Sequence, residues 1–222
     1  MNLSVLLNSV LFRGITEQEL KEMRGCLGAY EKSYQKGQMV YRMGDTVDAI
    51  GVVVTGSVII ENDDIWGNKS ILDHVGPGQI FAETYACIPG EPLMVNVVAS
   101  EKTEILFLNI SKVITTCCKT CTSHGKLIRN LLAIASQKNL NLSRRIFYTS
   151  SKSIRGRLLS YLSHQAMKEG SYEVVIPFNR QQLADYLGVD RSAMSNELSK
   201  MRNEGILTFD KNKFILINKE IE

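Results

Sequence analysis

The 222-residue sequence predicts an α+β fold in three parts: a small domain of short strands, a long helix, and a helical domain closed by a β-hairpin. Three observations support this prediction. Short β-branched runs punctuated by glycine fill residues 30–110, an apolar helical period runs through residues 111–148, and residues 179–204 have the pattern of two helices joined by a tight turn. The expected parts are residues 1–110, 111–150 and 151–222.

Composition excludes several classes of protein. Hydrophobic residues make up 44% of the chain and charged residues 22%, as in ordinary globular proteins, which argues against long disorder. The most apolar run, Ile50 to Ile60, is too short for a membrane helix. The N-terminus lacks the basic segment of a signal peptide, and five cysteines, two of them adjacent, make a poor disulfide framework. We therefore expect a soluble, cytoplasmic protein with no membrane partner.

Charge is distributed unevenly although the net charge is only +3. Residues 1–110 carry a net charge of −6, residues 111–150 carry +7 with no acidic residue, and residues 151–222 carry +2. An acidic first half followed by a basic second half indicates a polyanionic partner. A solvated basic helix is the alternative, and charge alone does not decide between them.

The N-terminal segment, residues 3–29, is expected to be helical. Leu6, Leu7 and Val10 have helical spacing, and Thr16 with Glu19 forms a capping box, in which each side chain accepts a hydrogen bond from the other residue's backbone amide.

Residues 30–110 are expected to form one β domain. Short strands at roughly ten-residue spacing, with turns such as Gly76-Pro77-Gly78 between them, favour a sandwich or a barrel. The predicted strands are Met39–Arg42, Ile50–Val54, Ser57–Glu61, Ser70–Val75, Leu93–Ala99 and Glu104–Leu108.

The long helix carries two apolar stripes and must therefore be covered on two sides. One cover is the chain's own β domain, and the other is a second copy of the chain in a coiled-coil-like seam. A helix buried within a monomer is the alternative. The candidate dimer-helix residues are Leu127, Leu131 and Ile134, and the neighbouring stripe consists of Ile128, Leu132, Ala135 and Leu142. A polar break at residues 149–153 ends the helix, and Ile154, Leu158, Leu159 and Leu162 indicate one more amphipathic helix.

Residues 179–204 have the pattern of a helix-turn-helix. Asn179 is a suitable N-cap for a helix that ends at Leu187, Gly188 can take the positive φ that ends it, and Asp190 is the N-cap of a second helix. Ala184 is small where the two helices come closest. The expected shared core consists of Leu183, Leu187, Met194, Leu198 and Met201.

The outward face of the second helix suits the floor of a DNA major groove, because it combines short hydrogen-bonding side chains with one arginine. An ordinary helical hairpin, the alternative, does not need such a face. A β-hairpin follows at residues 206–217, with Lys211 in its turn and Lys213 beside it, and such a wing can hold the phosphate backbone. The outward residues are Arg191, Ser192, Ser195, Asn196 and Ser199.

With these parts in order, nearly the whole chain resembles the Crp–Fnr family of bacterial transcription regulators. The resemblance rests on residues 34–45 and Val54–Val58, which look like hairpins of a cyclic-nucleotide-binding-type β-roll, and on Gly78–Glu83, which leads toward a phosphate-binding cassette. It implies a β-roll (a double-stranded β-helix or jelly roll), a long dimerisation helix and a winged helix-turn-helix. It also implies a homodimer on double-stranded DNA, with RNA polymerase as a further partner if the protein activates transcription.

The resemblance fails at the ligand cassette. Leu93 and Met94 stand where nucleotide-binding members have an Arg-Ser pair, and Ala82 replaces the usual glycine. Neither Leu93 nor Met94 supplies a donor to a phosphate, so we expect no binding of cyclic AMP. A pocket of this lining would suit an apolar or aromatic effector of unknown identity; the alternatives are a filled pocket and a β-roll that serves only as an interaction module. The candidate lining consists of Phe81, Ala82, Glu83, Leu93, Met94 and Val95.

The resemblance also implies roles at the DNA. It places base contacts on Arg191, Ser192 and Asn196, with Ser195 at a base or a phosphate. Ser192 and Asn196 stand where many members have glutamate and arginine, so the preferred half-site should differ. The candidate phosphate contacts are Arg180, Gln181, Lys200, Lys211 and Lys213.

The cysteines raise a second hypothesis. Only Cys26 lies where iron–sulphur members carry a cluster, but Cys117, Cys121 and His124 would share one helical face and could bind a metal or haem, or sense oxidants. Buried cysteines acting as small hydrophobic residues are the alternative, and the sequence requires no cofactor. The sequence contains neither GxSxG nor HExxH nor a phosphate-binding glycine loop, so we expect no enzymatic activity.

Overall fold

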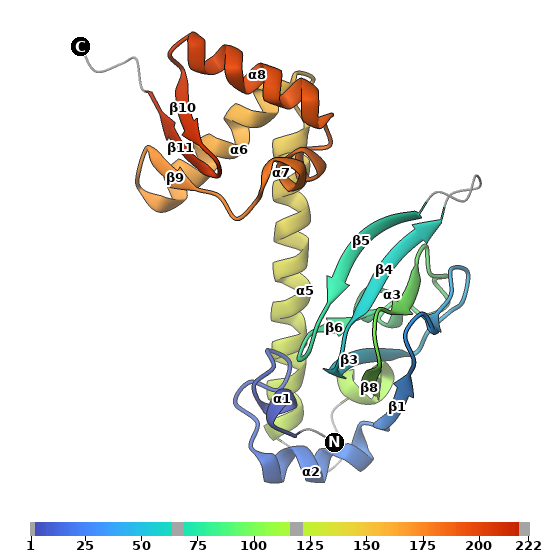
Figure 1. Cartoon of the computed structure of the whole chain (residues 1–222). Helices are drawn as coiled ribbons and strands as arrows, with labels where there is room; N and C mark the ends of the chain where they lie inside the picture. The colour runs from blue at the N-terminus through green and yellow to red at the C-terminus, as the bar shows by residue number, and fades with distance from the viewer. Residues whose placement is uncertain (1–2, 64–68, 116–121, 218–222) are drawn as a thin grey trace. The chain divides into compact units, whose positions relative to one another are not determined.

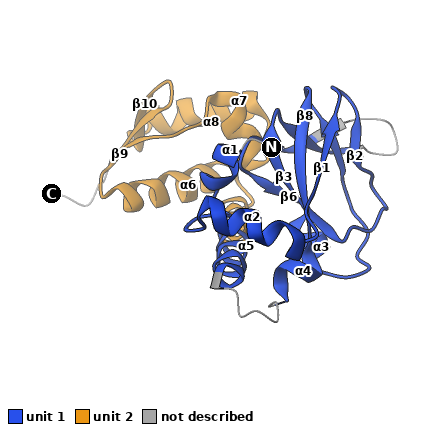
Figure 2. Ribbon diagram, turned by 90° about the horizontal axis from the view of Figure 1, so that it is seen from below, with its two compact units in different colours: residues 1–137 blue, residues 138–222 orange. Residues whose placement is uncertain are grey.

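A computed structural model describes residues 3–63, 69–115 and 122–217 of the chain. It divides into two compact units, residues 1–137 and residues 138–222 (Figure 2). The boundary lies within the long helix α5, Thr122–Thr149 (Figure 1). The three-part division with boundaries near residues 110 and 150 stays a prediction.

Two antiparallel four-stranded sheets form the β-roll of the first unit, with strand orders β1-β8-β3-β6 and β2-β7-β4-β5. All six predicted strands are present, but β1 and β6 were not predicted, because β1 is polar and mostly exposed and β6 has only two residues. The strands are β1 (Tyr30–Tyr34), β2 (Met39–Tyr41), β3 (Ala49–Thr55), β4 (Val58–Asp63), β5 (Lys69–Val75), β6 (Ile80–Phe81), β7 (Asn96–Ala99) and β8 (Thr103–Asn109).

The sheet that contains β3 and β8 is buried on both faces. Side chains alternate across a strand, so Ala49 and Val53 point into the roll, while Ile50 and Val52 point to the opposite face. That opposite face packs against apolar residues of the N-terminal segment, of α4 (Ile110–Ile114) and of α5. The roll therefore has an aromatic-rich interior and, behind it, a second core made with helices.

The N-terminal segment is not one helix, so the prediction of helix over residues 3–29 is wrong in its middle. Helices α1 (Leu3–Leu7) and α2 (Glu17–Cys26) flank a stretch of turns that includes Gly14 at a φ of 75°. Leu11 and Phe12 in this stretch are fully buried, and a right-handed helix cannot continue through the positive φ of Gly14.

The predicted capping box at the start of α2 is confirmed, and it extends to α5. The Glu19 amide donates to Thr16 Oγ1 at 3.3 Å, and the Thr16 amide donates to Glu19 Oε2 at 2.7 Å. The other Glu19 oxygen accepts from Ser123 Oγ at 2.8 Å and from Lys126 Nζ at 2.9 Å. One carboxylate thus joins the starts of two helices.

The first apolar stripe of α5 faces the chain's own core. Leu127 and Leu131 are 0% and 6% exposed, and Ile134 packs against the same cluster. The prediction that these three residues supply dimer contacts is therefore corrected, because they already pack in the core formed with the sheet that contains β3 and β8. The neighbouring stripe points outward, with Leu132 64% exposed and Leu142 62% exposed. Helical structure does not run unbroken from residue 111, because Thr115 has extended backbone after α4.

The second unit is a winged helix-turn-helix, as predicted. Its three-stranded sheet has the order β10-β11-β9, and the core residues predicted from the helix-turn-helix pattern are fully buried. Its elements after α5 are α6 (Ile154–Glu169), β9 (Glu173–Val175), α7 (Arg180–Leu187), α8 (Arg191–Asn203), β10 (Leu207–Asp210) and β11 (Lys213–Leu216).

The hydrogen bonds on Glu19 predict a pH-dependent stability. The Thr16 amide first, and then Lys126 and Ser123, lower the pKa of Glu19 from 4.5 to about 2. A carboxyl whose pKa is lower in the folded chain stabilises the fold above its unfolded pKa and loses that effect as the pH falls toward the folded pKa. Thermal unfolding of Glu19→Gln should therefore show a deficit against wild type at neutral pH that shrinks between pH 4.5 and about 2.

The control for this experiment is Glu22→Gln, an exposed carboxylate on the same helix. Glu22 accepts from Gln18 Nε2 of its own helix at 2.7 Å, so Glu22→Gln should be less destabilising at neutral pH than Glu19→Gln, whose carboxylate also joins α5. A Glu19→Gln deficit that does not change with pH would refute the coupling.

Candidate nucleic-acid interface

The turn between α7 and α8 is fixed by hydrogen bonds at the helix ends. At the start of α7, the Gln182 amide donates to Asn179 Oδ1 and the Asn179 amide donates to Gln182 Oε1, each at 2.9 Å. Gly188 ends the helix at a φ of 63°, a conformation that glycine adopts without a Cβ clash. The Val189 amide then donates to the Ala184 carbonyl at 3.0 Å. The predicted caps at Asn179 and Gly188 are confirmed.

Asp190 caps the recognition helix α8 and also engages one candidate base-reading residue. Its carboxylate accepts from the Ala193 amide at 2.8 Å and from Ser192 Oγ at 2.5 Å. These bonds, that from Ser192 first, lower the pKa of Asp190. A serine hydroxyl has a single donor, so Ser192 meets a ligand in this arrangement as an acceptor.

The remaining candidates on α8 differ in exposure. Arg191 and Asn196 are exposed at the first turns of the helix, whereas Ser195 is half-buried. The Ser195 carbonyl accepts from Ser199 Oγ at 3.0 Å, so Ser199 is bonded to its own helix. Lys200 is exposed in the last turn. Arg191 and Asn196 are therefore the long polar side chains that α8 presents at its N-terminal half.

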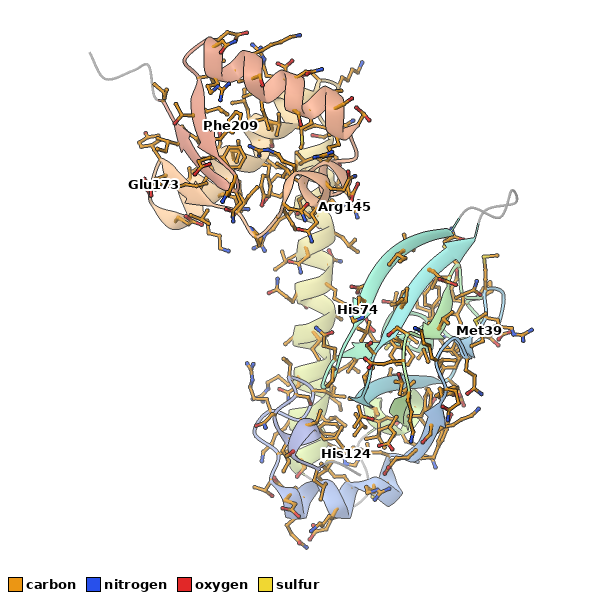
Figure 3. All side chains as sticks on the ribbon, viewed as in Figure 1. Met39, His74, His124, Arg145, Glu173 and Phe209 are labelled. Atoms are coloured by element: carbon orange, nitrogen blue, oxygen red, sulfur yellow. The ribbon has the colours of Figure 1, made fainter. Side chains whose placement is uncertain are left out.

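Arg180 packs against the wing. Its guanidinium carbon lies 4.6 Å from the ring centroid of Phe209, which Figure 3 labels, and 4.9 Å from that of Phe214. Burial against these rings lowers the pKa of Arg180. Because each ring attracts the cation, this contact ties the start of α7 to strands β10 and β11. Gln181 donates to the Asp185 carboxylate of its own helix at 2.8 Å.

The wing tip brings two candidate phosphate contacts together. Lys211 lies in the turn at a φ of 50°, and with Arg180 it lines a hollow of about 500 Å³ between the wing and the start of α7. Asn212 holds the tip, because its Nδ2 donates to the Ile176 carbonyl at 2.9 Å. Lys213 faces Glu173 of β9 at 2.7 Å, with both side chains about half exposed. Such an exposed pair is easily opened by a competing anion.

An arginine that the sequence did not single out fixes the recognition helix. Arg155 of α6 donates through Nε to Glu197 at 2.5 Å and through both terminal nitrogens to Glu204 at 2.7 and 2.8 Å. The bonds to Glu204 and then to Glu197 raise the pKa of the Arg155 guanidinium above its ordinary value. The carboxylates stand 42 and 49 residues away in the sequence, and no local spacing relates them.

Two protein-family models match this chain. A cyclic nucleotide-binding domain matches residues 31–117, and a Crp-like helix-turn-helix domain matches residues 156–220. Together they account for most of the sequence, in the order of the β-roll and the winged unit described above. The chain belongs to the Crp–Fnr family of transcription regulators.

Individual relatives agree with the Crp–Fnr assignment. The chain is 25% identical to the "Cyclic AMP receptor protein" of Thermus thermophilus, covering 90% of this chain and 88% of that protein. It is 21% identical to the "Transcriptional activator protein FnrL" of Cereibacter sphaeroides, covering 85% and 76%. The crystal structure of the Thermus thermophilus catabolite activator protein has the same fold, with a TM-score of 0.51, 20% identity and 94% of each chain covered.

The β-roll of this Crp–Fnr protein is packed with its own aromatic rings. Phe81 lies directly over Gly51, where a Cβ would overlap its ring, and it meets Tyr41 and Phe107 edge to face at centroid distances of 6.1 and 6.4 Å. Tyr34 joins the same cluster through Phe107. Phe81 faces the roll interior and fills part of it, and its role in lining an effector pocket stays a prediction.

The other candidate pocket residues do not form one lining. Leu93 is buried and Glu83 is buried in the first turn of α3 (Glu83–Ala86), but Met94 is 69% exposed, which contradicts its place in an enclosed pocket. Met94 and Val95 lie in a bend that precedes β7, and Val95 is half-buried. Ala82 stands at a φ of 62°, the left-handed conformation that the family's usual glycine adopts freely.

Two of the three residues of the metal or redox hypothesis, Cys117 and Cys121, lie outside the described residues. His124 lies at the start of α5 (Figure 3), is 1% exposed, and its Nδ1 has no hydrogen-bond partner among the described residues. Within those residues no group of three or more potential metal ligands occurs, and Cys26 and Cys87 are free and exposed.

Among the described residues, no helix is both long enough and apolar enough to cross a bilayer.

Proposed function

We propose that this chain acts as a homodimer that binds a specific DNA sequence through α8 and responds to a small effector other than cyclic AMP. The observation that carries the proposal is the exposed N-terminal half of α8, held by caps and by Arg155 and flanked by a wing with an exposed lysine at its tip. The chemistry is binding rather than catalysis. If the protein activates transcription, RNA polymerase is a further partner.

The base contacts follow from the positions on α8. The N-terminal residues of a recognition helix reach base edges, and arginine pairs with the two acceptors of guanine through its fork of donors. Arg191 is the first residue of α8 and is exposed. Asn196 suits adenine, and Ser192 accepts from a base amino group while its proton is held by Asp190. Ser195 is assigned to a base or a phosphate at the edge of this set.

The proposed phosphate contacts surround the base-contacting residues of α8. Lys211 at the wing tip and Lys200 on the last turn of α8 are exposed cations, and Lys213 becomes available when its pair with Glu173 opens. Arg180 and Gln181 lie in the first turn of α7, where backbone amides can also donate to a phosphate. Arg180 is held by its rings, so it offers a pre-positioned cation rather than a mobile one.

The Arg191→Ala variant should weaken specific binding by roughly 1–3 kcal/mol and relax the preference at one base pair, because two hydrogen bonds to guanine are lost. The measurement is a gel shift on a duplex selected from random sequences with the wild-type protein. The control is Arg13→Ala, which removes an equal charge from an exposed site in the other unit. Equal affinities of Arg191→Ala and wild type for the selected duplex would remove Arg191 from the contact set.

The dimer is proposed to form along the outward stripe of α5. Its residues recur at alternating spacings of four and three, the period of a two-stranded coiled coil, and a parallel second copy presents the same stripe in the same register. Asn139 falls within it, and a single asparagine at such a position favours a parallel, in-register pair because it bonds to its counterpart. A pair of recognition helices can then meet half-sites about one helical turn apart. The proposed seam consists of Ile128, Leu132, Ala135, Asn139, Leu142 and Ile146.

Leu142→Glu should convert the dimer to a monomer at micromolar concentration, because it places two like charges in an apolar seam. Light scattering after size exclusion measures the mass directly. The matched control, Gln137→Glu, adds the same charge on the opposite face of α5 and should remain dimeric. The proposed seam is wrong if Leu142→Glu stays a dimer, and the homodimer itself is wrong if the wild type is a monomer.

The effector is proposed to act by population shift, favouring one orientation of the helix-turn-helix units. The Thermus thermophilus relative is named for cyclic AMP. In this chain Leu93 is buried, and its backbone carbonyl and amide are hydrogen-bonded to the Gly44 amide and the Asp45 carbonyl. Met94 faces solvent. Neither residue offers a cation or hydroxyl to a cyclic phosphate.

Calorimetric titration with cyclic AMP should therefore give no measurable heat of binding at micromolar protein concentration. The relative named for cyclic AMP serves as the positive control under the same conditions. Micromolar affinity of this chain would overturn the exclusion. A thermal-shift screen of small aromatic and apolar compounds then searches for the effector, since a ligand of the native state raises the melting temperature.

A further inference from the structure

The C-terminal end of α7 is held by two arginines that lie outside the helix-turn-helix. Arg145, which Figure 3 labels, lies in the penultimate turn of α5. It donates through Nε to the Tyr186 carbonyl at 3.2 Å and through Nη2 to the Asp185 carbonyl at 3.4 Å. Arg157, in the first turn of α6, donates through Nη1 to the carbonyls of Leu187 at 3.0 Å and Gly188 at 2.9 Å. We call Arg145 and Arg157 the arginine clamp.

The clamp meets a physical need of the turn. The last carbonyls of an α-helix have no partner within the helix, and they carry the negative end of its dipole. Four successive carbonyls, from residue 185 to residue 188, accept from the two guanidinium groups, and that of Asp185 also accepts from the Gly188 amide at 3.3 Å. Arginine suits this place better than lysine, because its planar fork serves two acceptors at once and its charge does not titrate. The Arg145 guanidinium also stacks over Tyr186, 5.8 Å from the ring centroid.

The clamp is itself anchored to the turn between α5 and α6. Arg157 donates through Nε to the Ser151 carbonyl at 2.8 Å. Gly156 lets the chain pass close to this turn, because a Cβ there would overlap Ser151. The last turn of α5 is fixed to α6 by Tyr148, whose hydroxyl lies 2.8 Å from His164 Nδ1. Each of these contacts lies within the second unit.

Resting on the proposed binding of DNA through α8, we propose that Arg145 and Arg157 are positioning residues for DNA recognition. They fix the α7–α8 turn to the end of α5, and so set the direction in which α8 presents Arg191, without touching DNA themselves. The competing role for Arg145 is that of one more cation on a basic surface, which would bind a phosphate. The two roles differ in what they require: positioning requires the fork of donors, whereas phosphate attraction requires only the charge.

The neighbouring residue supplies a matched control. Arg144 is exposed and makes no hydrogen bond or ion pair among the described residues. Arg144→Ala and Arg145→Ala therefore remove the same charge from adjacent positions, and only the second removes donors from the turn. Arg145→Lys keeps the charge and loses the fork.

The test measures affinity for the selected duplex at several salt concentrations. Arg145→Ala and Arg145→Lys should each lose roughly tenfold in affinity, because charged hydrogen bonds to the turn are lost, while the slope of affinity against salt stays at the wild-type value. Arg144→Ala should change affinity much less. Hydrogen exchange on the protein alone should show faster exchange at the amides of Gly188 and Val189 in both Arg145 variants, and not in Arg144→Ala.

Three outcomes would overturn the proposal. Arg145→Ala and Arg144→Ala could lose affinity equally with equally reduced salt slopes, which would make both of them phosphate contacts. Arg145→Lys could bind as wild type, which would show that charge suffices. Unchanged exchange at the turn in both Arg145 variants would show that the clamp does not hold it. Arg157→Lys repeats the test from α6 if Arg145→Ala fails to fold.

Discussion

Recognition by the winged unit depends on how the polar groups around one tight turn are satisfied. A helix-turn-helix places two helix ends side by side, and each end leaves backbone groups without partners. Here the side chains of Asn179 and Asp190 accept hydrogen bonds from amides at the starts of α7 and α8, and Gly188 takes the positive φ that ends α7. Arginines from α5 and α6 donate to the carbonyls at the end of α7. A turn with its polar groups paired has few alternative conformations, so α8 keeps a defined direction.

The first unit is organised by a related need, the burial of apolar surface on both faces of a sheet. A sheet that buries both faces needs a cover on each side, and β3 with β8 obtains one from the aromatic interior of the roll and the other from helices. The helical cover uses the stripe of α5 that contains Leu127 and Leu131. The neighbouring apolar stripe, which includes Leu132 and Leu142, then remains exposed on α5. The dimer surface proposed for this chain is thus a consequence of how its own sheet is covered.

Features that depend on neighbours in the sequence were predictable. The capping box at Thr16, the N-cap at Asn179, the glycine at 188 and the buried face of α8 each follow from spacing over a few residues. The sequence also showed that α5 carries two stripes, but it did not show which stripe the β-roll covers, because that depends on tertiary packing. Strand β1 was missed for a related reason: its exposed, polar residues are held by pairing with β8.

The arginines show most clearly where sequence reasoning ends. The basic surplus of residues 111–150 suggested a polyanion, yet Lys126 is paired with Glu19 and Arg145 serves carbonyls of α7. Further along, Arg155 and Arg157 are also engaged within the protein. A cation already bonded internally releases no counterion at a phosphate, so it adds nothing to the salt dependence of DNA binding. In the proposed complex, the electrostatic contact with DNA therefore rests on fewer cations than net charge implies, chiefly on the exposed Lys200 and Lys211. The internal arginines are proposed to contribute to affinity through geometry instead.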